Sequence, residues 1–405
     1  MIRKTVSILL GLALMLPVGA QEVKHNFIEE RVPAYDLPDP LVLNDGRKVK
    51  TRKVWEKQRR PQILDVFSSE MYGSIPGRPE GLHFETLSEE TVYDGLGLRK
   101  RVRIYLDADG FHWFDVLVHV PLGSGERVPF FVGLNFKGND ATLDERAASR
   151  WPYEMILAAG FGVATAWRDS VEPDGGAFVD PGDDPSFCRD GGVRAWYNEG
   201  GDWGAISAWA WGLSRILDYL ESESFADAAK VAVIGHSRLG KTALWAGAND
   251  TRFAAVISND SGCCGTAISR RVFGENFASI TVAFPHWFAA EFQNYRGRES
   301  DFPLDQNCLA ALAAPRPLYI ASATLDGWAD PRGEWTDAAS LDPVYRLYGR
   351  KGLRSSQYDA SVMPEADCPI ADGDVAYHIR SGKHNITAFD WEQYIGFLKR
   401  HFGAH

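Results

Sequence analysis

The chain has 405 residues, of which 45% are hydrophobic and 24% charged, and its formal net charge is −11. These values are ordinary for a globular protein, so they exclude a disordered chain, a collagen-like repeat and a coiled coil. The excess of acidic residues argues against a nucleic-acid-binding protein, which needs a basic face. The 13 tryptophans fit either a Trp-rich core or a surface on which sugar rings stack. No repeat or linker follows residue 20, so we expect one domain over residues 21–405.

The first 20 residues have the pattern of a secretory signal peptide. Arg3 and Lys4 precede an apolar run at residues 6–16, and the sequence PVGA leads up to Ala20. A basic region, an apolar region and a small-residue cleavage site are typical of export signals. The apolar run is too short to cross a bilayer comfortably, which disfavours a membrane anchor. We therefore expect cleavage near Ala20 and an exported protein, periplasmic or secreted, with no membrane span.

Alternating strands and helices are predicted beyond the N-terminal region. Residues 21–60 are rich in proline and charge, and we expect them to wrap the surface. Residues 170–203, rich in Gly, Asp and Pro, are predicted to form a long irregular insertion of the kind that lines binding sites. The alternation elsewhere predicts an α/β fold with a mostly parallel sheet. Apolar runs predict strands at residues 101–105, 113–120, 129–134, 163–167, 230–235, 253–258 and 317–321, and helices at residues 151–159, 203–221, 238–248 and 387–401.

The five cysteines match no zinc-binding pattern. Export permits disulfides, but an odd number leaves at least one thiol free. Adjacent cysteines can hardly bond to each other without strain, so Cys263 and Cys264 are not expected to pair together. A bridge from one of them to Cys308 or Cys368 stays open, and the sequence alone does not assign it; the fifth cysteine is Cys188.

A predicted strand-to-helix junction carries the candidate nucleophile, Ser237. The sequence GHSRLG at residues 235–240 fits G-x-S-x-x-G, a relaxed form of the G-x-S-x-G nucleophile elbow. A sharp turn strains the serine backbone, and a side chain at Gly235 would crowd that turn. The following helix would offer N–H groups to a developing oxyanion. A serine that only caps the helix is the alternative, and the strand and helix flanking this motif favour the catalytic interpretation.

A base for Ser237 is expected later in the chain, because the order in this fold is Ser, acid, His. His384 lies in a loop just before the last predicted helix, which is where the triad histidine belongs. The other four histidines that follow Ser237 are less well placed. His286 lies too early in the chain, His378 in a strand-like segment, His401 in the last helix and His405 at the terminus.

Two carboxylates compete to orient His384. Asp260 follows the predicted strand at 253–258, and Asp326 follows the predicted strand at 317–321. Both positions are carboxyl ends of strands, where loops build the site. The later position is the more usual one for the acid of an α/β-hydrolase, so Asp326 is favoured. Asp260 stays open as the alternative, or as a second group that helps to orient His384.

At this point the chain resembles a known family. The sequence GHSRLGK at residues 235–241 is similar to the G-C-S-R-x-G-K elbow of glucuronoyl esterases, carbohydrate esterase family 15. The resemblance implies an α/β-hydrolase fold, a three-layer αβα sandwich with loop insertions around the site. It also implies a serine esterase that needs no metal or cofactor and cleaves esters between 4-O-methyl-glucuronic acid on xylan and lignin alcohols. Segments similar to the bacterial branch lie at residues 133–139 (GLNFKGN), 260–263 (DSGC), 284–288 (FPHWF), 328–331 (WADP) and 382–384 (GKH).

The resemblance also implies roles for residues beyond the nucleophile and the base. Arg238 is implied to stabilise the oxyanion through its side chain and its backbone N–H, since a guanidinium is a charge-assisted donor. Lys241, one helical turn after Ser237, is implied to bind sugar hydroxyls. Glu275 and Trp328 are implied to line the uronate pocket, the alternatives being a surface charge for Glu275 and core packing for Trp328.

The chain departs from the family pattern at four positions. His236 replaces a cysteine of fungal members, so their disulfide beside the elbow is absent. Asp260 stands where fungal members carry the catalytic glutamate, whereas bacterial members often take the acid from the later loop. Ala283 stands near an expected second polar sugar contact, which bears on uronate preference, and Cys264 replaces a common glycine.

The sequence thus predicts an exported serine esterase that acts on uronate esters, without a cofactor, a nucleic-acid partner or a second subunit. Another carbohydrate esterase, such as an acetyl xylan esterase, is the alternative within enzymes. A non-catalytic sugar-binding protein that uses its Trp-rich loops is the alternative outside them.

Overall fold

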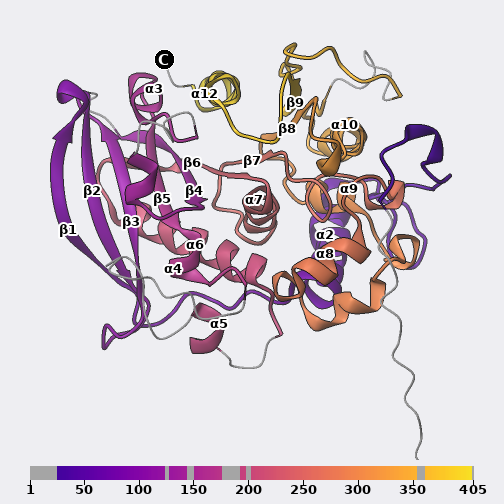
Figure 1. Cartoon of the computed structure of the whole chain (residues 1–405), viewed down its shortest axis with the longest axis horizontal. Helices are drawn as coiled ribbons and strands as arrows, with labels where there is room; N and C mark the ends of the chain where they lie inside the picture. The colour runs from indigo at the N-terminus through magenta and orange to yellow at the C-terminus, as the bar shows by residue number, and fades with distance from the viewer. Residues whose placement is uncertain are drawn as a thin grey trace, which may run out of the picture.

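The computed structural model describes residues 25–123, 127–143, 150–175, 192–197, 202–353 and 361–403. The predicted signal peptide and Cys188 lie outside these residues. One nine-stranded sheet runs through the molecule (Figure 1) in the order β1-β2-β3-β5-β4-β6-β7-β8-β9. The strands are β1 His83–Val92, β2 Gly97–Tyr105, β3 Trp113–Pro121, β4 Val128–Asn135, β5 Gly162–Trp167, β6 Ala226–His236, β7 Ala255–Asn259, β8 Leu318–Ala323 and β9 Val375–Arg380.

The sheet is mostly parallel, as predicted. The first three strands pair antiparallel, and β3 also runs antiparallel to β5. From β5 onward each neighbouring pair is parallel. Strands β4 to β9 are buried almost throughout, which explains their continuous apolar sequences. The carboxyl ends of β6, β7, β8 and β9 therefore meet at one edge of the sheet, which is where ligands bind in such folds.

Helices cover both faces of the sheet, which gives three layers. On one face α3 and α12 pack in a core with Phe131, Ile257 and Trp391. On the other face α6 and α7 lie in the larger core with Trp209 and Trp245. Figure 1 shows α12 and α3 on the opposite side of the strands from α7 and α6. The helices are α1 Arg52–Val54, α2 Arg60–Phe67, α3 Tyr153–Ala158, α4 Arg168–Val171, α5 Val193–Trp196, α6 Ala205–Ser222, α7 Arg238–Asn249, α8 Phe277–Ala283, α9 Gln306–Ala311, α10 Pro331–Ser340, α11 Asp342–Arg346 and α12 Ala388–Phe402.

Every strand and helix predicted from the apolar runs is present, with shifted ends. The expectation for residues 21–60 was wrong in part, because a helical run from Arg52 reaches α2 and buries Trp55 and Ile63. Strand β1 was missed because its side chains are mostly exposed, so its sequence lacks an apolar pattern. Residues 170–203 contain α5 and only partly lie in the described ranges.

The cysteines that the structure describes are all free, so the bridge left open to Cys308 or Cys368 is wrong. Cys263 and Cys264 lie side by side with a 3.8 Å Sγ···Sγ contact. Cys308 is buried on α9, and Cys368 is exposed. None of the helices in the described part of the chain combines the length and the apolar composition that a bilayer crossing requires.

Candidate active site

Ser237 sits at the turn between β6 and α7. Its backbone is strained, with φ 58° and ψ −129°, a region that few side chains occupy. A Cβ on Gly235 would lie 1.8 Å from the carbonyl oxygen of Leu239, so only glycine fits two residues before the serine. Gly240 packs tightly as well, because a Cβ there would lie 3.0 Å from Cβ of Ser261. The turn therefore has the geometry of a nucleophile elbow, although its second glycine stands one residue later than usual.

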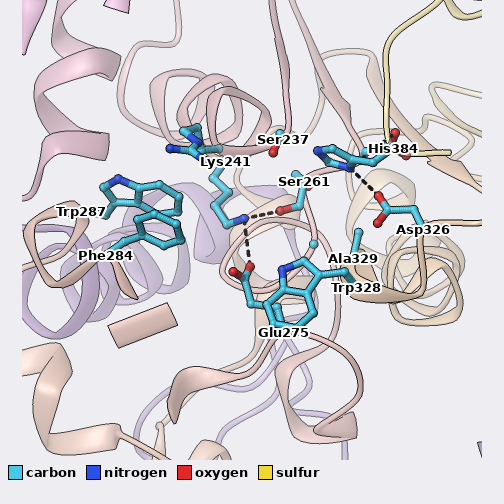
Figure 2. Close-up of a pocket in the computed structure, with 13 residues that line it drawn as sticks. Ser237, Lys241, Ser261, Glu275, Phe284, Trp287, Asp326, Trp328, Ala329 and His384 are labelled. Atoms are coloured by element: carbon cyan, nitrogen blue, oxygen red, sulfur yellow. Dashed lines mark hydrogen bonds and ion pairs between the residues drawn. The ribbon is translucent and has the colours of Figure 1, made fainter. Parts of the chain in front are cut away.

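His384 and Asp326 are joined by a short hydrogen bond. The two atoms, His384 Nδ1 and Asp326 Oδ2, are 2.5 Å apart, whereas Asp260 Oδ2 is 4.0 Å from the same nitrogen. The bond at Nδ1 leaves Nε2 of His384 for Ser237, which Figure 2 shows next to the imidazole. The geometry thus brings together the serine, the histidine and the favoured acid.

Asp260 lies deeper, beneath this hydrogen bond. It is 1% exposed, and its Oδ2 accepts a hydrogen bond from the backbone N–H of Asn385 and faces Arg380 at 3.5 Å. Burial, and then the nearby carboxylates of Glu334 and Asp326, raise the pKa of Asp260 well above its ordinary value. This shift disfavours the charged form of Asp260, and its bond from Asn385 lies in the loop of His384, so the position of Asp260 suits support of that loop.

Two side chains to which the sequence assigned no catalytic role, Arg380 and His236, fix the loop of His384. Arg380, the last residue of β9, donates from Nη2 to the carbonyl oxygens of Lys383 and Asn385, one on each side of His384. His236 packs its ring 4.4 Å from the His384 ring. Burial, and then the charge of His384, lower the pKa of His236 well below its ordinary value. A neutral His236 places no repelling charge beside His384 when that residue takes up a proton.

The guanidinium of Arg238 is held beside the nucleophile. It forms an ion pair with Asp174 and lies 4.6 Å from the ring centroid of Trp287. Asp174 also accepts hydrogen bonds from Trp287 Nε1 and His286. Burial opposes ionisation of Asp174, but the bond from His286 and the charges of Arg168 and Arg238 lower its pKa. Among the described residues Nε of Arg238 is buried with no hydrogen-bond partner, so its donor capacity is unused in this structure.

Lys241 and Glu275 form a buried polar wall. Lys241 Nζ donates to the carbonyl oxygen of Ser261 at 2.6 Å and lies 3.6 Å from Glu275 Oε2. The surface-charge alternative for Glu275 is wrong, because its side chain is only 8% exposed. The core-packing alternative for Trp328 is also wrong, because this residue is 43% exposed. Its carbonyl oxygen accepts a hydrogen bond from the N–H of Glu275.

A buried glutamate that sequence analysis missed supports this wall. Glu334, on α10, accepts hydrogen bonds from the N–H of Gly262 and from the hydroxyls of Thr266 and Ser322. Burial raises the pKa of Glu334 to about 7, although these hydrogen bonds by themselves lower it. The bonds fix the turn that presents the carbonyl of Ser261 to Lys241. No local signal could identify this role, because the three partners lie 72, 68 and 12 residues away in sequence.

All eight residues singled out from the sequence line one cavity of about 320 Å³. Figure 2 shows Ser237 and His384 at one side of it, with Glu275 and Trp328 across from them and Lys241 between. His378, in contrast, is buried within β9, as expected. Ala283 is exposed and lies outside the lining. The lining residues are Ser237, Arg238, Lys241, Asp260, Ser261, Gly262, Glu275, Phe284, Trp287, Asp326, Trp328, Ala329 and His384.

Within the described ranges, one group of side chains is spaced for a metal ion: Asp260, Asp326 and His384, with ligand atoms within 4.8 Å of one another. Two ligands of a tetrahedral zinc ion, each about 2.0–2.2 Å from it, lie more than about 3 Å apart. The contact of 2.5 Å between His384 and Asp326 is too short for that. These residues as placed therefore form a hydrogen bond and not a metal site.

Comparison with known proteins agrees with this geometry. A family model described as "Glucuronyl esterase, fungi" matches residues 187–349. A carbohydrate esterase from an unknown prokaryotic organism is 41% identical, over 95% of this chain and 94% of its own length. A 4-O-methyl-glucuronoyl methylesterase of Wolfiporia cocos is 31% identical, over 78% of this chain and 74% of its own length.

Solved structures give the same result. The glucuronoyl esterase from Solibacter usitatus is 40% identical with a TM-score of 0.83, covering 91% of this chain and 99% of that one. A promiscuous esterase of carbohydrate esterase family 15 from a marine bacterial metagenome is also 40% identical, with a TM-score of 0.82, covering 93% of this chain and 100% of that one. By sequence and by fold, the chain belongs to the glucuronoyl esterases of carbohydrate esterase family 15.

Proposed function

We propose that this protein is an exported serine esterase that hydrolyses esters of 4-O-methyl-glucuronic acid, such as those that join glucuronoxylan to lignin. One observation carries the proposal: a strained serine, a histidine bonded to a carboxylate, and a buried Lys–Glu pair all line the same cavity. The serine, the histidine and the carboxylate are the parts of an acyl-transfer site. The lysine and the glutamate are polar groups suited to sugar hydroxyls.

The reaction follows from these positions. Nε2 of His384 takes the proton of the Ser237 hydroxyl as its oxygen attacks the ester carbonyl carbon. The tetrahedral intermediate collapses, the bond to the alcohol oxygen breaks, and His384 passes the proton to the departing alcohol. A water molecule, deprotonated by His384, then attacks the acyl-enzyme; the bond to Oγ of Ser237 breaks, the uronate is released, and His384 returns the proton to Ser237. Asp326 keeps Nδ1 of His384 protonated throughout and stabilises the imidazolium.

Negative charge develops on the carbonyl oxygen beside the start of α7. The backbone N–H of Arg238 and its guanidinium are the proposed donors, and the ion pair with Asp174 and the contact with Trp287 hold the side chain in place. At the far side of the cavity, Lys241, Glu275 and Trp328 are the proposed contacts of the sugar ring.

Removing the guanidinium is expected to slow the chemical step. Arg238→Met should lower kcat on benzyl glucuronate about 10²- to 10³-fold, the usual cost of one oxyanion donor, with a smaller change in KM. Arg238→Lys should recover only part of this loss, because an ammonium cannot reproduce the planar donor set. Steady-state kinetics measure both, and a change confined to KM would contradict the role.

The class of substrate is tested by comparing esters. The wild-type protein should hydrolyse methyl and benzyl glucuronate and should release little acetate from acetylated xylan, because the buried Lys241–Glu275 pair recognises the acyl sugar. Acetate release at a higher kcat/KM than uronate ester hydrolysis would favour an acetyl xylan esterase. Absence of turnover on every ester, with the fold intact, would favour a sugar-binding protein.

Export belongs to the same proposal. The basic and apolar pattern of residues 1–20 supports a cleaved signal peptide, and a polymeric substrate of this kind lies outside the cell. The mature chain is proposed to act as a monomer with a single catalytic domain.

A further inference from the structure

The cationic side chains that line the cavity are each matched by a carboxylate. Lys241 Nζ lies 3.6 Å from Glu275 Oε2. His384, which becomes cationic during the proposed reaction, has Asp326 at 2.5 Å. The third cationic side chain of the lining, Arg238, finds its carboxylate outside the cavity, in the segment that follows β5. Within the described ranges, therefore, no cation of the lining lacks an opposite charge.

The carboxylate of Asp174 lies behind Arg238. It pairs with Nη1 of that guanidinium, its side chain is only 5% exposed, and it is not among the residues that line the cavity. Asp174 also lies 3.0 Å from Arg168, but Arg168 has a second carboxylate, Asp169, at 3.3 Å. Although burial opposes ionisation, the bond from His286 and the two arginine charges lower the pKa of Asp174, so it is an anion. Two guanidinium groups thus share two carboxylates.

Aromatic rings keep water away from the pair of Arg238 and Asp174. Cζ of Arg238 lies 4.6 Å from the ring centroid of Trp287 and 5.1 Å from that of Phe284, and the two rings stack 3.8 Å apart. Figure 2 shows both rings on one side of the cavity. In such surroundings charges interact more strongly than in water and are screened less by salt. The charge of Asp174 therefore bears on any ligand that Arg238 meets.

The proposed reaction changes the charge of the ligand only at its end. The ester is neutral. In the tetrahedral intermediate the negative oxygen is balanced by the proton that His384 has taken up, so the reacting groups carry no net charge. Hydrolysis then yields a uronic acid, whose carboxyl group has a pKa of about 3–4 and gives its proton to the solvent. A guanidinium aimed at the carbonyl oxygen of the ester is also a strong partner for this carboxylate.

We propose that Asp174 neutralises Arg238, so that the cavity accepts the neutral ester and its transition state but releases the anionic uronate. The inference rests on the proposed function and specifies its selectivity, which is for the ester over the acid that it becomes. Asp174 is a positioning residue, because it lies outside the cavity and acts through Arg238. Two carboxylates on one guanidinium repel each other. The oxyanion suffers less, because the imidazolium of His384 forms together with it.

Two inhibitors of the same shape test this inference: glucuronate, and its neutral amide, glucuronamide. Competitive inhibition constants are measured for both during hydrolysis of benzyl glucuronate at pH 7. The wild-type protein should bind glucuronate no more tightly than glucuronamide. Asp174→Asn keeps the size of the side chain and one acceptor oxygen but removes the charge. It should tighten the binding of glucuronate about 10-fold relative to glucuronamide, a difference of about 1.4 kcal/mol.

Two further variants show where the effect arises. Adding Arg238→Met to Asp174→Asn should abolish the gain for glucuronate, and this slower variant is assayed at a higher enzyme concentration. Asp115→Asn is the matched control. Asp115 also pairs with an arginine, Arg103 at 2.8 Å, and its side chain is 10% exposed, but it does not line the cavity. Asp115→Asn should leave the ratio of the two inhibition constants at its wild-type value.

The outcomes separate charge from support. Equal weakening of both inhibitors by Asp174→Asn would mean that Asp174 only holds the structure together, and would overturn the proposal. An equal change of the ratio in Asp115→Asn would do the same. Wild-type protein that binds glucuronate more than about 10-fold more tightly than glucuronamide would overturn it too, whether or not Asp174→Asn folds. Wild-type protein that hydrolyses no uronate ester would overturn the proposed function itself, which the other outcomes leave standing.

Discussion

Ser237→Ala is expected to lower kcat on benzyl glucuronate by about 10⁵-fold or more, because no other group in the cavity is held at the elbow beside His384. Alanine has the same backbone preferences as serine at φ 58°, so the strain of the turn is unchanged. The folded state should therefore keep its thermal midpoint within a few degrees. Pre-steady-state mixing should show no acyl-enzyme burst, and steady-state assays should show no turnover above background.

Ser222→Ala is a suitable control, because Ser222 ends α6 and its hydroxyl only donates to the carbonyl oxygen of Tyr219. It should retain wild-type kinetics. If Ser237→Ala kept more than about 1% of the wild-type kcat with its fold intact, the serine would not be the nucleophile. The esterase mechanism proposed above would then fail at its first step.

The two aspartates are expected to differ strongly. Asp326→Asn should lower kcat about 10³- to 10⁴-fold, since the amide removes the charge that stabilises the imidazolium and disfavours the correct tautomer of His384. Asp260→Asn should cost less than about 10-fold. Its carboxyl lies 4.0 Å from Nδ1 of His384, too far for a hydrogen bond, so it contributes less than Asp326 to stabilising the imidazolium.

The comparison needs both kinetics and stability. Asp260 also faces Arg380 and the N–H of Asn385, so Asp260→Asn should lower the thermal midpoint more than Asp326→Asn does. kcat is therefore compared at a temperature where both variants are folded. The reverse ranking of kcat would make Asp260 the triad acid and Asp326 the supporting group.

The parts of the fold that follow from local sequence were predictable. A strand buried on both faces must be continuously apolar, so β4, β6 and β8 were evident from their sequences. Strand β1 was not evident from its sequence, because an exposed edge strand need not be continuously apolar. The helical run that buries Trp55 was hidden by the charged residues around it, most of which are exposed or half-buried although Arg59 is buried.

The elbow and the loop of His384 were identifiable for a related reason. Chain order and position after a strand place such residues at the carboxyl edge of a parallel sheet, whatever the details of the loops. The supporting residues Glu334, Arg380 and Asp174 carry no sequence motif. Their roles depend on partners brought close by folding, as with the bond from Glu334 to Gly262 across 72 residues.

By itself, the sequence predicted the mostly parallel α/β architecture, the nucleophile Ser237, the base His384 and two candidate acids, because periodicity, glycine spacing and strand ends are local properties of the chain. The other candidate residues, Arg238, Lys241, Glu275 and Trp328, came from the resemblance to a known family. Only the tertiary structure decided between the two acids. Both follow strands, and a difference of 1.5 Å in their distance to His384 arises from how two loops pack. The rings of His25 and Phe27 were likewise brought to Phe273 and Trp328 by folding, through contacts that no local pattern encodes.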